Sequence, residues 1–110
     1  MKNTGVSRNV GFTLTNVTVR RQIDHVKVFL RGQGSNRYHV ILVDAYRLAL
    51  EFPNGSSLLS FSKLSVRHSI LKEIRIIRYP KKLHLVFELT PHVRYAVKIG
   101  IDGLAIQFKF

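Results

Sequence analysis

Residues 26–52 read VKVFLRGQGSNRYHVILVDAYRLALEF, and residues 83–108, LHLVFELTPHVRYAVKIGIDGLAIQF, repeat that pattern in degraded form. Three segments of the first stretch have counterparts in the same order in the second: VKVFLR with LHLVFE, RYHV with RYAV, and RLALEF with GLAIQF. Two copies are too few for a solenoid, which needs about three repeats to bury its faces. We therefore expect one domain that contains an internal duplication.

Apolar and polar residues alternate through both stretches, which is the pattern of strands with one buried face. Val26, Val28 and Leu30, for example, fall on one face of a strand, and Lys27 and Phe29 fall on the other. The alternation predicts eight strands, at Val17–Arg20, Val26–Arg31, Tyr38–Leu42, Arg47–Phe52, Ile74–Arg78, Leu83–Leu89, Tyr95–Ile99 and Leu104–Phe108. No apolar run keeps the helical period for three turns, so the predicted fold class is all-β, a sandwich of two pseudo-symmetric four-stranded sheets.

The domain organisation follows from the same pattern. We expect a linker or lead-in at residues 1–12 and a single domain over 13–110, with halves at 17–52 and 74–108 and a crossover at 53–73. Within the crossover, Leu58 and Phe61 are expected to close one end of the core. In the third strand, Leu42 is expected to face the core.

The charge balance indicates an anionic partner. Lys and Arg number 18 against 6 Asp and Glu, so the net charge is +12, beyond the roughly 2 to 8 units usual on a small domain. Nucleic acid, anionic lipid and carboxylate-rich cell-wall polymer would all be attracted to such a surface. No apolar run is long enough to span a membrane as a helix, so we expect no membrane insertion.

Residue constellations typical of enzymes are missing from the sequence. There is no cysteine, and the five histidines do not show metal-ligand spacing. His84 and Glu88 share a strand face, but four residues of strand separate them by about 13 Å, which is beyond hydrogen-bond reach. We therefore expect no catalysis, no cofactor and no metal site.

Several segments resemble AMIN domains. RLALEFP at residues 47–53 is similar to the segment that closes the first half of these domains, IRI at 74–76 with LHLVFEL at 83–89 to their second-half signature, and GLAIQF at 103–108 to their closing strand. The resemblance implies a periplasmic, non-catalytic module of two symmetric four-stranded sheets in a Gram-negative envelope. Such modules attach N-acetylmuramoyl-L-alanine amidases and type IV pilus secretins to peptidoglycan. The chain departs from the signature at Arg78 and His84, where the family usually has glutamine and arginine.

The predicted ligand-binding residues are those expected to point away from the core. Arg47 and Arg75 are the principal candidates, because both match family positions and guanidinium groups pair well with the free carboxylates of peptidoglycan stem peptides. The remaining candidates are Arg20, Arg31, Glu51, Tyr79, His84, Arg94 and Lys98. Outward apolar residues such as Phe29 and Ile41 lie among them, which favours a contact surface.

Two other functions remain open at the level of sequence. A basic sheet with aromatic residues can stack bases and neutralise phosphates, although the signature of RNA-recognition sheets is missing and we expect no nucleic-acid partner. A protein-docking module of an envelope or pilus assembly would instead use exposed sheet edges to pair with a neighbour.

Overall fold

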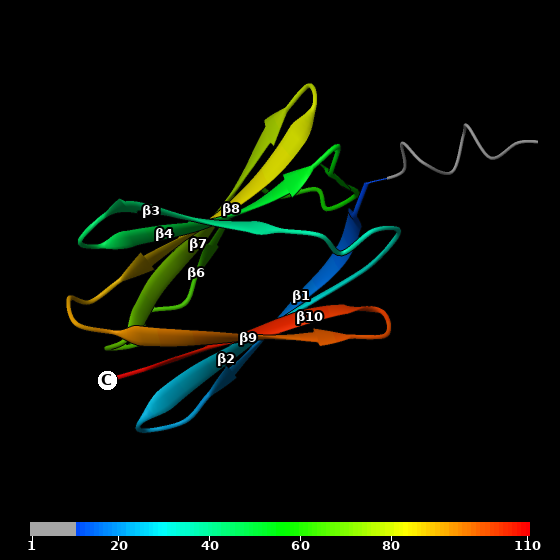
Figure 1. The fold of residues 1–110 in the computed structure, drawn as a ribbon. Coiled ribbons are helices and arrows are strands. Elements are labelled where there is room, and N and C mark those ends of the chain that lie inside the picture. The colour runs from blue at the N-terminus through cyan, green and yellow to red at the C-terminus, as the bar shows by residue number, and fades with distance from the viewer. Residues whose placement is uncertain (1–10) are drawn as a thin grey trace, which may run out of the picture.

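The computed structural model describes residues 11–110, which form ten strands in two five-stranded sheets and no helix (Figure 1). The strands are β1 (Thr13–Arg21), β2 (His25–Gln33), β3 (His39–Asp44), β4 (Arg47–Pro53), β5 (Ser56–Ser57), β6 (Lys63–Ser65), β7 (Leu71–Tyr79), β8 (Lys82–Leu89), β9 (Arg94–Gly100) and β10 (Gly103–Lys109). Sheet A has the order β5-β1-β2-β10-β9, and sheet B has the order β3-β4-β8-β7-β6. The predicted all-β class is confirmed.

Both sheets combine strands from the two ends of the chain. In sheet A, β2 pairs antiparallel with β10, so that Val28 lies opposite Ile106. In sheet B, β4 pairs antiparallel with β8, so that Leu50 lies opposite Leu85. Each sheet has five strands where the sequence predicted four, because the crossover adds β5 beside β1 and β6 beside β7. The two added strands are only two and three residues long.

The inward faces of the two sheets meet in a single hydrophobic cluster, which gives the molecule a sandwich-like arrangement (Figure 1). The alternation seen in the sequence supplies this cluster, since every second residue of β2, β4, β8 and β10 is buried. Aromatic rings join the layers: Phe12 stacks on Phe52 with centroids 4.9 Å apart, and Phe87 lies 5.1 Å from Phe108. Such pairs contribute about 0.5–1.5 kcal/mol beyond the burial of their surface.

Burial differs from the sequence prediction at β3. Leu42, expected in the core, is 71% exposed. The reason is topological, because β3 is the outermost strand of sheet B and is irregular between Leu42 and Asp44. Ala49 shows the opposite difference: its small side chain lies on the outer face but is buried between its cross-strand neighbours Ile41 and Val86.

The crossover and the lead-in also depart from expectation. Leu58 is 74% exposed and Phe61 is 37% exposed, so neither closes the core; Val66 and Ile70 of the same crossover are buried instead. Residues 1–10 of the predicted lead-in lie outside the described residues. Phe12, which the sequence assigned to that lead-in, is a core residue at 1% exposure.

Candidate binding faces of the two sheets

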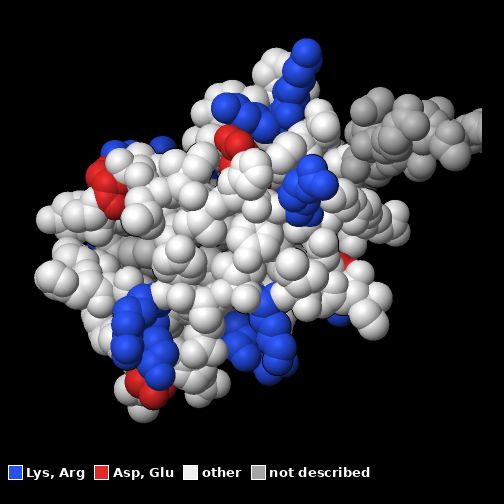
Figure 2. Space-filling model, viewed as in Figure 1, with Lys and Arg blue, Asp and Glu red and all other residues white. Residues whose placement is uncertain are grey.

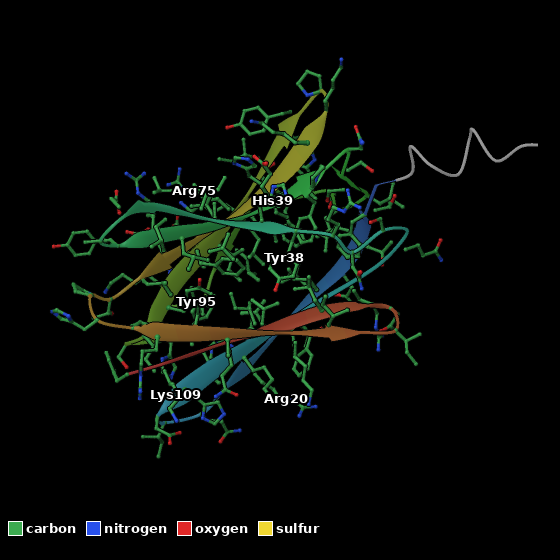
Figure 3. The ribbon with its side chains drawn as sticks, in the orientation of Figure 1. Arg20, Tyr38, His39, Arg75, Tyr95 and Lys109 are labelled. Atoms are coloured by element: carbon green, nitrogen blue, oxygen red, sulfur yellow. The ribbon has the colours of Figure 1, made fainter. Side chains whose placement is uncertain are left out.

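The structure divides the nine predicted ligand-binding residues between two opposite faces. Figure 3 shows Arg20 on the side of sheet A that points away from sheet B, and Arg75 beyond sheet B on the other side of the molecule. The strand registers assign the other residues in the same way. Arg20, Arg31, Arg94 and Lys98 lie on the outer face of sheet A, whereas Arg47, Glu51, Arg75, Tyr79 and His84 lie on the outer face of sheet B. The nine predicted ligand-binding residues therefore lie on two separate surfaces.

We call the outer face of β1, β2, β10 and β9 the cationic face. Its basic residues are Arg20, Lys27, Arg31, Arg94, Lys98 and Lys109. Cross-strand pairing arranges them in rows: Arg20 lies opposite Lys27, and Lys109 lies opposite Arg94. Like charges directly opposite each other in a sheet are destabilising, so this arrangement costs folding free energy.

Phe29 and small residues form the middle of the cationic face. Phe29 lies opposite Thr18 on one side and Ala105 on the other, and Ala105 lies opposite Lys98. The guanidinium carbon of Arg20 is 5.4 Å from the centroid of the Phe29 ring, and Nζ of Lys27 is 5.9 Å from it, both within cation–π range. These residues line a shallow hollow of about 480 Å³.

Few acids border the cationic face. Asp102, in the turn before β10, lies 3.2 Å from Nε of Arg31, and Asp24, in the turn before β2, lies 2.8 Å from Nδ1 of His25. Within residues 11–110, Arg20, Lys27 and Lys98 form no salt bridge. Their charge is thus available to a ligand.

The outer face of sheet B carries cations and acids in equal number. The basic residues are Arg47, Lys63, Arg75 and Lys82, and the acids are Asp44, Glu51, Glu73 and Glu88. Four of these groups border a hollow of about 430 Å³ that Ile41, Ile77 and Val86 also line; they are Arg47, Arg75, Glu73 and Glu88. Figure 2, which views the molecule from the side with sheet B above sheet A, shows Lys and Arg above and below a mostly white flank between the two sheets.

The two principal sequence candidates are held by acids of the chain itself. Both Nε and Nη2 of Arg47 donate to Oδ2 of Asp44, at 3.0 and 2.7 Å, and Nε of Arg75 donates to Oε2 of Glu73. These hydrogen bonds are the main cause that lowers the pKa of Asp44 and of Glu73. Arg47 and Arg75 do point outward as predicted, but a ligand carboxylate would have to compete with these partners.

Glu51 and His84 form a cluster that the sequence analysis missed. Nε2 of His84 lies 2.8 Å from Oε1 of Glu51, and this hydrogen bond is the largest cause that lowers the pKa of Glu51. Lys82 lies 3.7 Å and His39 3.6 Å from the same carboxylate, and the Tyr79 ring meets His84 edge-on. The sequence analysis had examined Glu88 as the partner of His84 along one strand. The actual partner lies on β4, and only the pairing of β4 with β8 would have revealed it.

Arg78 has a structural role on the side of the crossover. Its guanidinium group donates to the carbonyl oxygens of Leu59 and Phe61 and to Oγ of Ser62. Arg21, its counterpart in the first half, donates from Nε and Nη2 to the carbonyl oxygen of Val66 at 3.4 Å. Both arginines therefore hold the backbone of the crossover.

The described residues were also searched for metal sites and membrane-spanning helices. In the part of the chain that the structure describes, no group of three or more potential ligand side chains is placed to hold a metal ion, and no helix is long and apolar enough to cross a membrane. Scans of the chain against protein-family models, curated proteins and solved structures found no match. The likeness to AMIN domains therefore rests on the sequence segments alone.

Proposed function

We propose that this chain is a non-catalytic binding domain that lies with the cationic face of sheet A against an acidic polymer. The observation that carries the proposal is the collection of six Lys and Arg residues on one face of a sheet, where Asp102 and Asp24 are the bordering acids. The resemblance to AMIN domains favours peptidoglycan as this polymer. The domain would then localise a larger protein, such as an amidase or a type IV pilus secretin, in the periplasm of a Gram-negative bacterium.

The shape of the cationic face suits a polymer of sugars and peptides. Neighbouring strands lie about 4.8 Å apart, so the four strands between Arg20 and Lys98 span about 14 Å, enough for several sugar rings. Ala105 and Gly103 keep the β10 surface low, while Phe29 offers an aromatic ring to a sugar. Arginine and lysine at the rim would pair with stem-peptide carboxylates, and charge-assisted hydrogen bonds of this kind are the stronger ones.

We also propose that the two halves of the chain arose by duplication and form two pseudo-symmetric four-stranded units. The strand order supports this proposal. If β1, β2, β3 and β4 are matched with β7, β8, β9 and β10, the order β1-β2-β10-β9 of sheet A becomes β7-β8-β4-β3, which is the order found in sheet B. The same matching pairs Arg21 at the end of β1 with Arg78 near the end of β7, and both donate to backbone carbonyl oxygens of the crossover.

Co-sedimentation with purified peptidoglycan sacculi tests the binding proposal. The test variant is Arg20→Ala with Lys98→Ala, and the matched control is Arg47→Ala with Arg75→Ala, which also removes two charges. Exposed ion pairs contribute about 0.5 kcal/mol each, so we expect the test variant to bind about fivefold more weakly and the control to bind within about twofold of the wild type.

Three outcomes would contradict the proposal. Loss of binding only in the control variant would assign the ligand to sheet B. Failure of the wild type to sediment with sacculi at low salt would exclude the polymer altogether. Tight retention of single-stranded RNA with no binding to sacculi would favour the nucleic-acid alternative, for which the Phe29 ring beside Arg20 and Lys27 supplies a stacking platform.

A further inference from the structure

The four outer edges of the two sheets differ in how well they are protected against pairing with another chain. An edge strand exposes unpaired backbone groups, and proteins protect such edges with very short strands or with charged side chains. At three edges these devices are present: β5 has two residues and the part of β1 beyond it carries Arg20 and Arg21, β6 has three residues, and β9 carries Arg94 and Lys98. The fourth edge, β3, is six residues long, and its sequence HVILVD contains neither Lys nor Arg. Its acid, Asp44, and its irregularity between Leu42 and Asp44 lie at its end, so residues 39–42 have neither protection.

The side chains of β3 are apolar and exposed. Ile41, Leu42 and Val43 are 36%, 71% and 48% exposed, respectively. Further exposed apolar residues, Tyr95 and Ile99, lie on β9, the neighbouring edge of sheet A. In Figure 2 most of the middle of this side of the molecule is white, with Lys and Arg above it, below it and at its right. A contiguous apolar surface rimmed by charge is typical of an interaction site.

We propose that β3 pairs antiparallel with β3 of a second copy of this chain, so that two sheets B join into one continuous sheet. A two-fold axis perpendicular to the sheet at Ile41 places the two copies of this residue opposite each other. The same register places Val40 opposite Leu42 and His39 opposite Val43, so no two like charges meet. Contacts that are their own complement in this way are typical of two-fold dimers.

The distribution of charge favours a second copy at this edge. Two chains of net charge +12 repel each other, and the repulsion is smallest where the local charge is balanced. Four of the six acids of the chain, Asp44, Glu51, Glu73 and Glu88, lie on sheet B or in its β3–β4 turn. The cationic face points away from sheet B, so most of its basic residues are kept away from the junction, although Arg94 of β9 borders the same hollow as Leu42 and Asp44 of β3.

The proposed dimer does not depend on the proposed function, but dimerisation would strengthen the binding of an acidic polymer. A two-fold axis perpendicular to sheet B leaves both cationic faces pointing to the same side of the dimer. A flat acidic polymer could then be held at two places by one particle. Two linked sites bind more tightly than either alone, because the second contact forms at a high effective concentration.

Sedimentation equilibrium of the isolated chain tests the proposal without any ligand. We expect the average mass to rise with concentration from 12.6 kDa toward twice that value. Ile41→Lys places two ammonium groups opposite each other at the axis and should weaken dimerisation at least about tenfold. The matched control is Ile77→Lys, because Ile77 is 37% exposed on the same outer face but lies on β7, away from the edge.

A wild-type chain that stays at 12.6 kDa up to about 1 mM would overturn the proposal. Equal effects of the two variants, or a dimer that survives Ile41→Lys, would overturn it as well. Hydrogen exchange gives a second readout that does not require a variant: the amides of residues 39–44 should become protected as the wild-type concentration rises. Circular dichroism shows whether each variant keeps its β structure. This experiment contains no sacculi, so a chain that does not dimerise would leave the binding proposal to be decided by co-sedimentation.

Discussion

Replacement of Gly103 by alanine should strongly destabilise the fold. Gly103 begins β10 and lies between Arg31 of β2 and Gly100 of β9. Its φ angle is +148°, a backbone conformation that residues other than glycine rarely adopt. A Cβ atom added there would lie 1.9 Å from the carbonyl oxygen of Leu30, and 3.1 Å from the Cα of Arg31. Because both atoms are backbone, the strands themselves would have to move apart.

The magnitude follows from two costs. Overpacking in a rigid region costs about 1–3 kcal/mol, and forcing alanine into an unfavourable backbone region costs about another 1–3 kcal/mol. We therefore expect Gly103→Ala to lower the free energy of unfolding by about 3 kcal/mol, a large fraction of the 5–15 kcal/mol that is usual for a domain.

Gly100 provides the matched control, because it lies directly opposite Gly103 in the sheet. The nearest atom to a Cβ at Gly100 is the carbonyl oxygen of Gly103 at 3.8 Å, an ordinary contact distance. Gly100→Ala should change the free energy of unfolding by less than about 1 kcal/mol, with stabilisation expected if the backbone fits. Equilibrium urea unfolding followed by circular dichroism measures both variants. Equal losses, or a loss below about 1 kcal/mol at Gly103, would refute the steric argument.

Two further predictions concern the outer face of sheet B and the crossover. The hydrogen bond from His84 lowers the pKa of Glu51 from its ordinary 4.5, so this pair stabilises the fold above about pH 4.5, and the stabilisation is lost as the pH falls through the lowered pKa. In urea unfolding at a series of pH values, Glu51→Gln should therefore reduce the loss of stability on acidification below about pH 4.5. An unchanged loss in this variant would contradict the assignment. Arg78→Ala should release the crossover backbone at residues 59–62 and speed the hydrogen exchange of its amides. Gly100→Ala should leave that exchange unchanged. Unchanged exchange at 59–62 in Arg78→Ala would show that the three hydrogen bonds of Arg78 do not hold this backbone.

The strands could be predicted from the sequence because their period is local. Val26, Val28 and Leu30 stand at every second position of one strand, and they are buried as expected. The pairing of β2 with β10 is not local, since it joins residues near 28 to residues near 106, and no spacing within either strand encodes it. That pairing decides which residues share a face, so the sequence could show that Arg20 and Arg75 point outward but not that they point to opposite sides.

Edge positions and ion pairs could not be predicted from the sequence either, because they also depend on how the strands and turns are arranged in space. Leu42 fits the alternation of a buried strand, yet β3 ends the sheet and sheet A does not cover this residue. Arg47 reaches Asp44 across the β3–β4 turn, and a separation of three residues brings two side chains together only when the turn has the right shape. The short strands β5 and β6 carry too few residues to show any period.

The interleaving of the two ends of the chain has a consequence for how the molecule assembles. Neither sheet can be completed until residues after 82 have met residues before 53, so the first half emerges during synthesis with β2 and β4 still lacking their central partners. Such distant pairings make folding slow relative to helical domains of equal size. If the chain were cut at the crossover, the two pieces would be insoluble or would depend on each other to fold. Mixing the two pieces would be the only way to regain the native core.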